Sequence, residues 1–150
     1  MTSTGEEAIH VGSSAALTLS DVVFAQYREI GVLLHRGFRL TDVMNQCFGN
    51  KDGHGKGRQM PVHYGSAKAN FHTISSPLAT QLPQATGIAF TLKNTGNACA
   101  CYFGDGAASE GDAHPAFNFA STMGVPALFL WWGGGGVFPP YFFFFYKNQH

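Results

Sequence analysis

The segment from residue 98 to residue 132 restricts the fold of this 150-residue chain more than any other. ACACYF, residues 98–103, predicts a short strand, and GDGAASEGD after it predicts a glycine-rich turn. AFNFASTMG, residues 116–124, predicts a helix that Gly124 ends, and VPALFLWW predicts a second strand. This order forms a βαβ unit, whose two strands are parallel and joined by a right-handed crossover. The sequence therefore predicts an α/β fold with a parallel sheet.

Apolar spacing predicts three more helices. SDVVFAQYREIGVLLHRG, residues 20–37, has apolar residues at helical spacing after Ser20 and predicts one helix that ends near Gly37. TDVMNQCFGN predicts a short second helix, and LATQLPQATGIAFTLK predicts a third whose small residues suit close packing on another helix. The glycine-rich stretch 50–70 lacks periodicity, and a loop of this length indicates a functional segment.

The two ends of the chain differ from its centre. We expect residues 1–18 to be a disordered N-terminal segment, residues 19–130 to form the domain, and residues 131–150 to be an aberrant tail. The tail holds nine of the 21 aromatic residues and has no alternation or helical period, which indicates translated intron or a shifted frame. Residues 125–146 carry no charge, but four consecutive glycines and a Pro-Pro pair would break a membrane-spanning helix. We expect no membrane span.

Charge and cysteine content exclude further classes. Nine Lys and Arg balance nine Asp and Glu, so no basic field attracts nucleic acid. Cys47, Cys99 and Cys101 are odd in number and lack C-x-x-C spacing, which favours a reducing compartment. Cys99 and Cys101 lie on the same side of the predicted strand and indicate core positions. The histidines lack a zinc-binding pattern.

The GDG tripeptide, residues 104–106, is the candidate functional motif. Its carboxylate lies between two glycines at the carboxyl end of a strand, where parallel sheets bind ligands. Backbone amides of the following helix can hold phosphate oxygens while Asp105 holds a hard cation, which indicates a diphosphate with magnesium. A simple tight turn explains the tripeptide equally well. DGHGKGR lacks the Ser or Thr of a nucleoside-triphosphate loop, and Ser109 replaces a glycine of the dinucleotide fingerprint.

Four stretches carry a resemblance to a known family. FAQYREIGVLLHRG, GKGRQMPVHYG, TISSPLATQLPQATG and CYFGDGAASEGDAHPAFNFA are similar to the alpha subunit of the branched-chain 2-oxo acid dehydrogenase, the thiamine-diphosphate-dependent decarboxylating component. The similarity runs from about Leu19 to Leu130. RQMPVHYG and SEGDAH resemble the branched-chain type more than the pyruvate type.

The resemblance implies a partial thiamine-diphosphate-binding fold and a set of site residues. The diphosphate would contact a Tyr-Arg pair on an early helix, a loop serine and the residues after the magnesium ligand Asp105, and potassium would bind in the ISSPLATQ loop. The cofactor residues would be Tyr27, Arg28, Ser76, Gly106 and Ala107, and the potassium ligands would be Ser75, Pro77, Thr80 and Gln81. His63, near the expected cofactor mouth, is a candidate substrate contact.

The resemblance also implies an activity, partners and a compartment. These are oxidative decarboxylation of branched-chain 2-oxo acids, acyl transfer to a lipoyl-bearing transacylase, an alpha2-beta2 assembly with a beta subunit, and the mitochondrial matrix. The family's later Arg-Asn-Asn motif would fall on Trp132, Gly133 and Gly134. We therefore expect no catalytic residue in this chain, and a chain that is inactive alone and does not bind the cofactor alone. A non-catalytic fragment that docks on the beta subunit and a pyruvate-specific relative are the alternatives.

Overall fold

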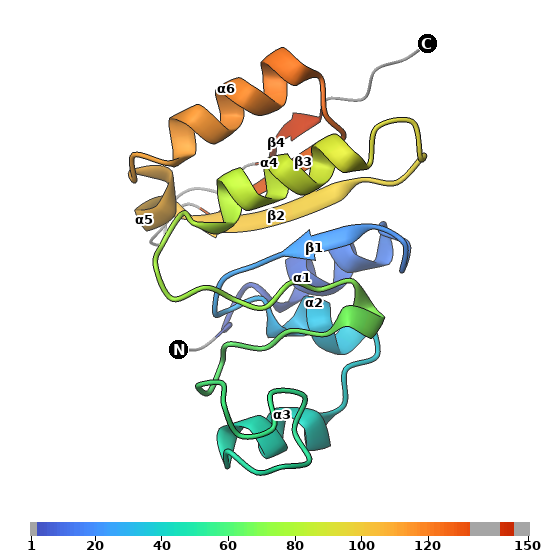
Figure 1. The fold of residues 1–150 in the computed structure, drawn as a ribbon, viewed down its shortest axis with the longest axis vertical. Coiled ribbons are helices and arrows are strands. Elements are labelled where there is room, and N and C mark those ends of the chain that lie inside the picture. Colours follow the sequence, from blue (N-terminus) through green and yellow to red (C-terminus); the bar gives the residue numbers. More distant parts are fainter. Residues whose placement is uncertain (1–2, 133–141, 146–150) are drawn as a thin grey trace.

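The computed structural model describes residues 3–132 and 142–145, and a four-stranded sheet lies at its centre (Figure 1). The strands are β1 (Val22–Phe24), β2 (Cys99–Gly104), β3 (Ala127–Trp132) and β4 (Phe142–Phe145), in the order β1-β2-β3-β4. β1, β2 and β3 run parallel, and β4 runs antiparallel to β3. The α/β fold with a parallel sheet is confirmed.

The predicted βαβ unit is present between β2 and β3. The short helix α5 (Asp105–Ala108) follows β2 directly, and α6 (Ala113–Met123) leads to β3. Gly124 ends α6 in the left-handed conformation, with φ of 57°, where a residue with a side chain is disfavoured. Gly124 and the apolar residues before and after it therefore determine where α6 ends and β3 begins, without a partner distant in sequence.

Helices cover both faces of the sheet (Figure 1). Cys99, Cys101 and Phe103 of β2 lie in a core cluster with α4 (Gln81–Thr91) and α6. Ala100 and Tyr102, the alternate residues, lie in a second cluster with α2 (Ile30–His35). Successive side chains of a strand point to opposite faces, so a strand covered on both sides is apolar throughout. All six residues of β2 are buried.

Small residues allow α4 and α6 to pack closely, as predicted. Ala85 and Ala89 of α4 and Ala116 and Ala120 of α6 are all buried in the same cluster. Thr86 donates from its hydroxyl to the carbonyl of Ala116 at 3.2 Å, which adds a polar contact between the helices. Larger side chains at these positions would hold the two backbones further apart.

The single helix predicted over residues 20–37 was wrong. Residues 22–24 form β1, and helix α2 begins only at Ile30. Val22, Val23 and Phe24 pair with residues 99–101 of β2, so a partner distant in sequence determines their conformation. β-branched residues are common in both buried strands and apolar helix faces, so spacing alone did not separate the two.

The expectation of disorder over residues 1–18 was also wrong for the described residues. Helix α1 spans Glu7–Ala15 and packs against α2. Gly31 of α2 permits the contact, because a Cβ atom there would lie 2.9 Å from the Cβ of His10. His10 and Ser14 are buried in this interface. The sequence did not predict α1, because its many polar and small residues leave no apolar stripe at helical spacing.

Arg36 joins three segments at the end of α2. Its guanidinium donates to the carbonyls of Ala69 at 2.7 Å, Thr18 at 2.9 Å, Leu19 at 3.3 Å and Asp21 at 2.7 Å. The side chain is buried in the process. The chain before β1 and the short helix η1 (Ala67–Ala69) are therefore held against α2 by one residue.

The remaining predictions concern α3, the long loop and the tail. Helix α3 spans Leu40–Cys47, close to the predicted second helix, and the following loop contains only η1 as regular structure. Within the described residues no helix has the length and apolar content needed to cross a membrane. β4 lies inside the predicted aberrant tail, and the rest of the tail beyond Trp132 lies outside the described residues.

Candidate functional site

A pocket of about 440 Å³ opens where the parallel strands β1 and β2 end. One wall is the loop after β1, residues 26–29, and the other is the segment 104–107 after β2, with Leu78 between them. Ligands of parallel sheets bind outside the carboxyl ends of the strands. Five residues named from the sequence line this one pocket: Tyr27, Arg28, Asp105, Gly106 and Ala107.

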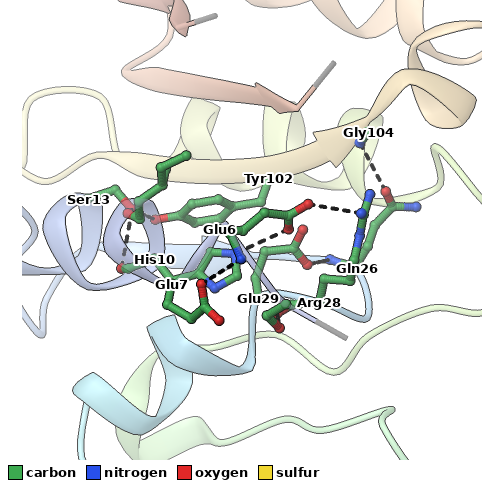
Figure 2. A network of polar contacts seen from close by, with 12 residues as sticks. Glu6, Glu7, His10, Ser13, Gln26, Arg28, Glu29, Tyr102 and Gly104 are labelled. Atoms are coloured by element: carbon green, nitrogen blue, oxygen red, sulfur yellow. Dashed lines mark hydrogen bonds and ion pairs between the residues drawn. The ribbon is translucent and has the colours of Figure 1, made fainter. Parts of the chain in front are cut away.

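Gln26 connects the two walls of the pocket by a hydrogen bond (Figure 2). Its side-chain carbonyl accepts a hydrogen bond from the backbone N–H of Gly104 at 3.2 Å. Its own backbone N–H donates to the carboxylate of Glu29 at 2.9 Å. The loop after β1 is therefore anchored to the residue that precedes Asp105. Sequence reasoning missed Gln26 and Glu29, because it assigned both to a helix and they carried no motif of their own.

Glu29 is an almost completely buried carboxyl, with 2% of its surface exposed. Burial raises the pKa of Glu29, and hydrogen bonds from backbone N–H groups, including that of Gln26, and the charge of Arg28 oppose the rise only in part. The group also lines the pocket. This carboxyl beside Arg28 therefore binds a proton more readily than an exposed glutamate does.

Tyr27 and Arg28 lie in the loop between β1 and α2, and the prediction that they lie on a helix was wrong. Arg28 donates from Nη1 to Oε1 of Glu6 at 2.9 Å, an ion pair with the residue before α1 (Figure 2). The Arg28 side chain is 40% exposed and lines the pocket. A guanidinium has five N–H donors, so this pair leaves donors for an anion.

Asp105 is the exposed first residue of α5. The N–H groups at the start of a helix have no acceptor within it, so those of Gly106 and Ala107 are available to an anion beside Asp105. Among the described residues, no group of three or more His, Cys, Asp or Glu could hold a metal ion. A cation at Asp105 would therefore take further ligands from a bound anion or water. Its binding there stays a prediction.

Ser76 contacts Tyr27, one of the residues that line the pocket. The Tyr27 hydroxyl donates to the carbonyl of Ser76 at 2.5 Å, and the Ser76 hydroxyl lies 2.7 Å from Nε2 of His63. Nδ1 of His63 lies 2.9 Å from the carbonyl of Pro61, which can only accept, so Nδ1 carries the proton. In the neutral ring Nε2 then accepts from Ser76. His63 also contacts Tyr27 edge to face, with ring centroids 5.2 Å apart.

The predicted potassium ligands lie in the loop that leads into α4. Thr80 is the residue before α4, and Gln81 is its buried first residue. Gln81 donates from Nε2 to the carbonyl of Tyr102 at 3.2 Å, which orients the amide. Ala79, with φ of 66°, turns the backbone sharply between Ser75 and Pro77 on one side and Thr80 on the other. Hydroxyl, amide and carbonyl oxygens suit a hard cation, and potassium binding stays a prediction.

The long loop forms a second pocket of about 370 Å³. His63 lines it and also contacts Ser76 and Tyr27, so the loop and the first pocket meet at this histidine. The other lining residues are Gln46, His54, Gly55, Arg58, Gln59, Gly65 and Thr73. The loop therefore shapes the surroundings of the site, and its functional role stays a prediction.

The chain is similar to known proteins over most of its length. The model of the family "Dehydrogenase E1 component" matches residues 1–131. The alpha subunit of mitochondrial 2-oxoisovalerate dehydrogenase from Caenorhabditis elegans is 59% identical over 132 residues, which are 86% of this chain and 31% of that protein. The protein of the same name from Dictyostelium discoideum is 59% identical over 131 residues, 86% of this chain and 30% of that protein.

The similarity extends to plants. Alpha subunit 2 of the Arabidopsis thaliana enzyme is 60% identical over 131 residues, 86% of this chain and 28% of that protein. This chain thus spans about 30% of the length of the curated relatives that it matches. The family match covers α1, the pocket and the βαβ unit up to Trp131. The chain belongs to the dehydrogenase E1 component family.

Proposed function

We propose that this chain supplies the alpha-subunit side of the thiamine-diphosphate site in a branched-chain 2-oxo acid dehydrogenase. One observation carries the proposal: a single pocket joins the Tyr27-Arg28 pair to the Asp105-Gly106-Ala107 segment. A cationic side chain and a carboxylate on opposite walls suit a diphosphate with a divalent cation. The names of the relatives support the branched-chain substrate class.

Each pocket residue has a distinct role in this proposal. Arg28 would bind a phosphate group of the cofactor through its N–H donors, and the amides of Gly106 and Ala107 would bind phosphate oxygens beside α5. Asp105 would hold magnesium. Gln26 keeps the two walls at a fixed separation through Gly104. The chain therefore binds and orients the cofactor.

The loop before α4 supports the rim of the pocket. Potassium bound by Ser75, Pro77, Thr80 and Gln81 would fix this loop, and with it the backbone of Ser76 that accepts from Tyr27. Ser76 would contact the cofactor directly, and its hydroxyl is oriented by His63. A loop cation would therefore act on the cofactor site through Tyr27 and Ser76.

Thiamine diphosphate, when bound, supplies the electron-accepting chemistry that allows a 2-oxo acid to lose carbon dioxide. We propose that a beta subunit completes the site and that the acyl group passes to the lipoyl group of a transacylase. The mitochondrial matrix is the proposed location, since the relatives carry the word mitochondrial in their names.

Inorganic pyrophosphate with magnesium tests the proposal without the whole enzyme. In a titration of the full chain to roughly 10 mM, a range suited to contacts of a few kcal/mol, amide NMR signals of residues 26–28 and 104–107 should shift together. Asp105→Asn should abolish the magnesium dependence, and Asp112→Asn, a matched exposed acid before α6, should retain it. Shifts confined to other residues, or none, would refute the proposal.

The chain alone should not bind thiamine diphosphate tightly. The positions of the expected Arg-Asn-Asn motif hold Trp132, Gly133 and Gly134, which offer neither a cation nor a second magnesium ligand. Calorimetry on the full chain with thiamine diphosphate and magnesium should therefore show no micromolar binding. A micromolar dissociation constant would contradict this expectation.

A further inference from the structure

Glu6, which no sequence motif singled out, contacts the pocket arginine from a separate helix. Glu6 precedes α1, and its Oε1 accepts from Nη1 of Arg28 at 2.9 Å across 22 residues of sequence. Its side chain is 20% exposed, whereas that of Arg28 is 40% exposed. The carboxylate is thus the more buried partner of the ion pair drawn in Figure 2, and Arg28 lines the pocket.

A second contact from the same segment holds the backbone of Arg28. The Ser3 hydroxyl donates to the Arg28 carbonyl at 2.5 Å, and the Ser3 carbonyl accepts from the N–H of Glu6 at 3.0 Å. The backbone and the side chain of Arg28 are therefore both bound by residues 3–6. The start of α1 and the loop after β1 form one unit at the rim of the pocket.

The charges around Glu6 make Arg28 its main counter-ion. Nε2 of His10 lies 3.8 Å from Oε2 of Glu6, but burial lowers the pKa of His10, so its ring is mostly neutral at neutral pH. Glu7 is exposed and accepts from the N–H of Gly5 at 2.8 Å. Among the residues that the structure describes, Arg28 is the one permanent cation at hydrogen-bonding distance from Glu6.

We infer that Glu6 is a positioning residue that orients Arg28 for an anionic ligand such as a diphosphate. The inference rests on the proposed function, because it requires an anion in this pocket. An arginine side chain loses rotamer entropy when it is immobilised. Glu6 binds one N–H group and restricts the side chain before the ligand arrives, which leaves the other donors directed at the pocket.

The opposite role for Glu6 makes the opposite prediction. If the carboxylate competed with the ligand for Arg28, its removal would strengthen anion binding, since a negative charge near an anion site is unfavourable. If Glu6 positions Arg28, its removal weakens binding even though a repulsive charge is lost. The sign of the change in affinity therefore separates the two roles.

The experiment titrates the full chain with inorganic pyrophosphate and magnesium, monitored by the amide signals of residues 104–107. Glu6→Ala should weaken binding about two- to five-fold, within the range that the loss of one partly exposed ion pair produces. Glu6→Gln, which keeps an acceptor, should recover part of the loss. Glu7→Ala, which removes the same charge one residue away without touching Arg28, should leave the affinity unchanged. Equal or tighter binding by Glu6→Ala would overturn the inference.

Two further measurements show that the effect acts through Arg28. In an Arg28→Ala background, Glu6→Ala should have no additional effect on affinity, as expected for two groups that act through one contact. Without ligand, the Arg28 Nε–H signal should show an ordered side chain in the wild type and a more mobile one in Glu6→Ala. An additive effect, or an Arg28 that is equally mobile in both, would overturn the inference.

The two proposals fail in different ways. If the wild-type chain shows no pyrophosphate-dependent shifts at residues 104–107, the proposed function fails. If those shifts occur but Glu6→Ala binds as well as the wild type, the proposed function stands and the positioning role of Glu6 fails. Amide spectra of each free variant, compared with the wild type, show whether the fold is intact.

Discussion

Replacing the buried Arg36 should lower the stability of the fold. Arg36 donates four hydrogen bonds to backbone carbonyls, and two of these, to Ala69 and Asp21, are buried. Arg36→Ala leaves those two carbonyls without a donor in a place that water reaches poorly. An unsatisfied buried acceptor costs about 1–3 kcal/mol, so the pair costs about 2–6 kcal/mol.

Two effects reduce the loss of stability expected for Arg36→Ala. The other two carbonyls keep a donor within the protein: that of Thr18 accepts from the N–H of Asp21 at 3.2 Å, and that of Leu19 accepts from Nδ2 of Asn70 at 2.8 Å. The variant also avoids the loss of rotamer entropy of an immobilised arginine, about 2 kcal/mol. The expected decrease in the free energy of unfolding is about 0–4 kcal/mol with a central value of about 2 kcal/mol, a sizeable part of the 5–15 kcal/mol typical of a domain.

Urea denaturation followed by circular dichroism measures this change as a lower midpoint at unchanged slope. Arg36→Lys keeps the charge but cannot direct donors to four carbonyls, so it should recover only part of the loss. Arg58→Ala is the matched control, because Arg58 lies exposed in the long loop; its midpoint should stay close to that of the wild type. If Arg36→Ala unfolds at the wild-type midpoint, the carbonyl contacts do not hold these segments together.

Three other outcomes are expected. Gly65→Ala should lower stability by about 1–3 kcal/mol, since the added Cβ would lie 2.7 Å from the Cα of Thr73, whereas Gly87→Ala, with open space in α4, should raise it by about 0.5–1 kcal/mol in the same urea assay. Burial raises the pKa of Glu29, so its contribution to stability is greatest at low pH and falls as the pH rises above about 4.3 through the folded-state pKa; Glu29→Gln should be more stable than the wild type near pH 7, and an advantage equally large near pH 4 would refute the assignment. A thiol reagent should modify only the exposed Cys47 in the folded chain, because the two strand cysteines are buried and burial raises the pKa of one of them to about 12; three rapid equivalents before unfolding would contradict the fold.

The parts of the fold that were predictable depend on short-range pattern. Gly124 after an apolar helix, followed directly by VPALFLWW, identifies the end of α6 and the start of β3 without any distant partner. β1 was not predictable in this way, because Val22 to Phe24 become a strand only through pairing with β2. Helix α1 lacked a signal for the same reason, since its stability comes from contact with α2.

The residues of the candidate site also differ in how far the sequence predicted them. Asp105 stood out because two glycines flank it at the end of a strand, and Tyr27 and Arg28 stood out only through a family resemblance. Glu6 and Gln26 were missed, because their importance depends on an arginine and a backbone amide far away in the sequence. Sequence patterns identify groups that face a ligand more readily than groups that hold those groups in place.

The pairing of β1 with β2 has a consequence for the order of folding events. Asp21, just before β1, accepts from the N–H of Ala98 across 77 residues, so forming this pair closes a long loop at a cost in chain entropy. The unit β2-α6-β3 closes over a much shorter stretch, and we expect it to form sooner. We therefore expect the loop with Tyr27 and Arg28 to reach the end of β2 after β2 and β3 have paired, so that the two walls of the pocket meet late in folding.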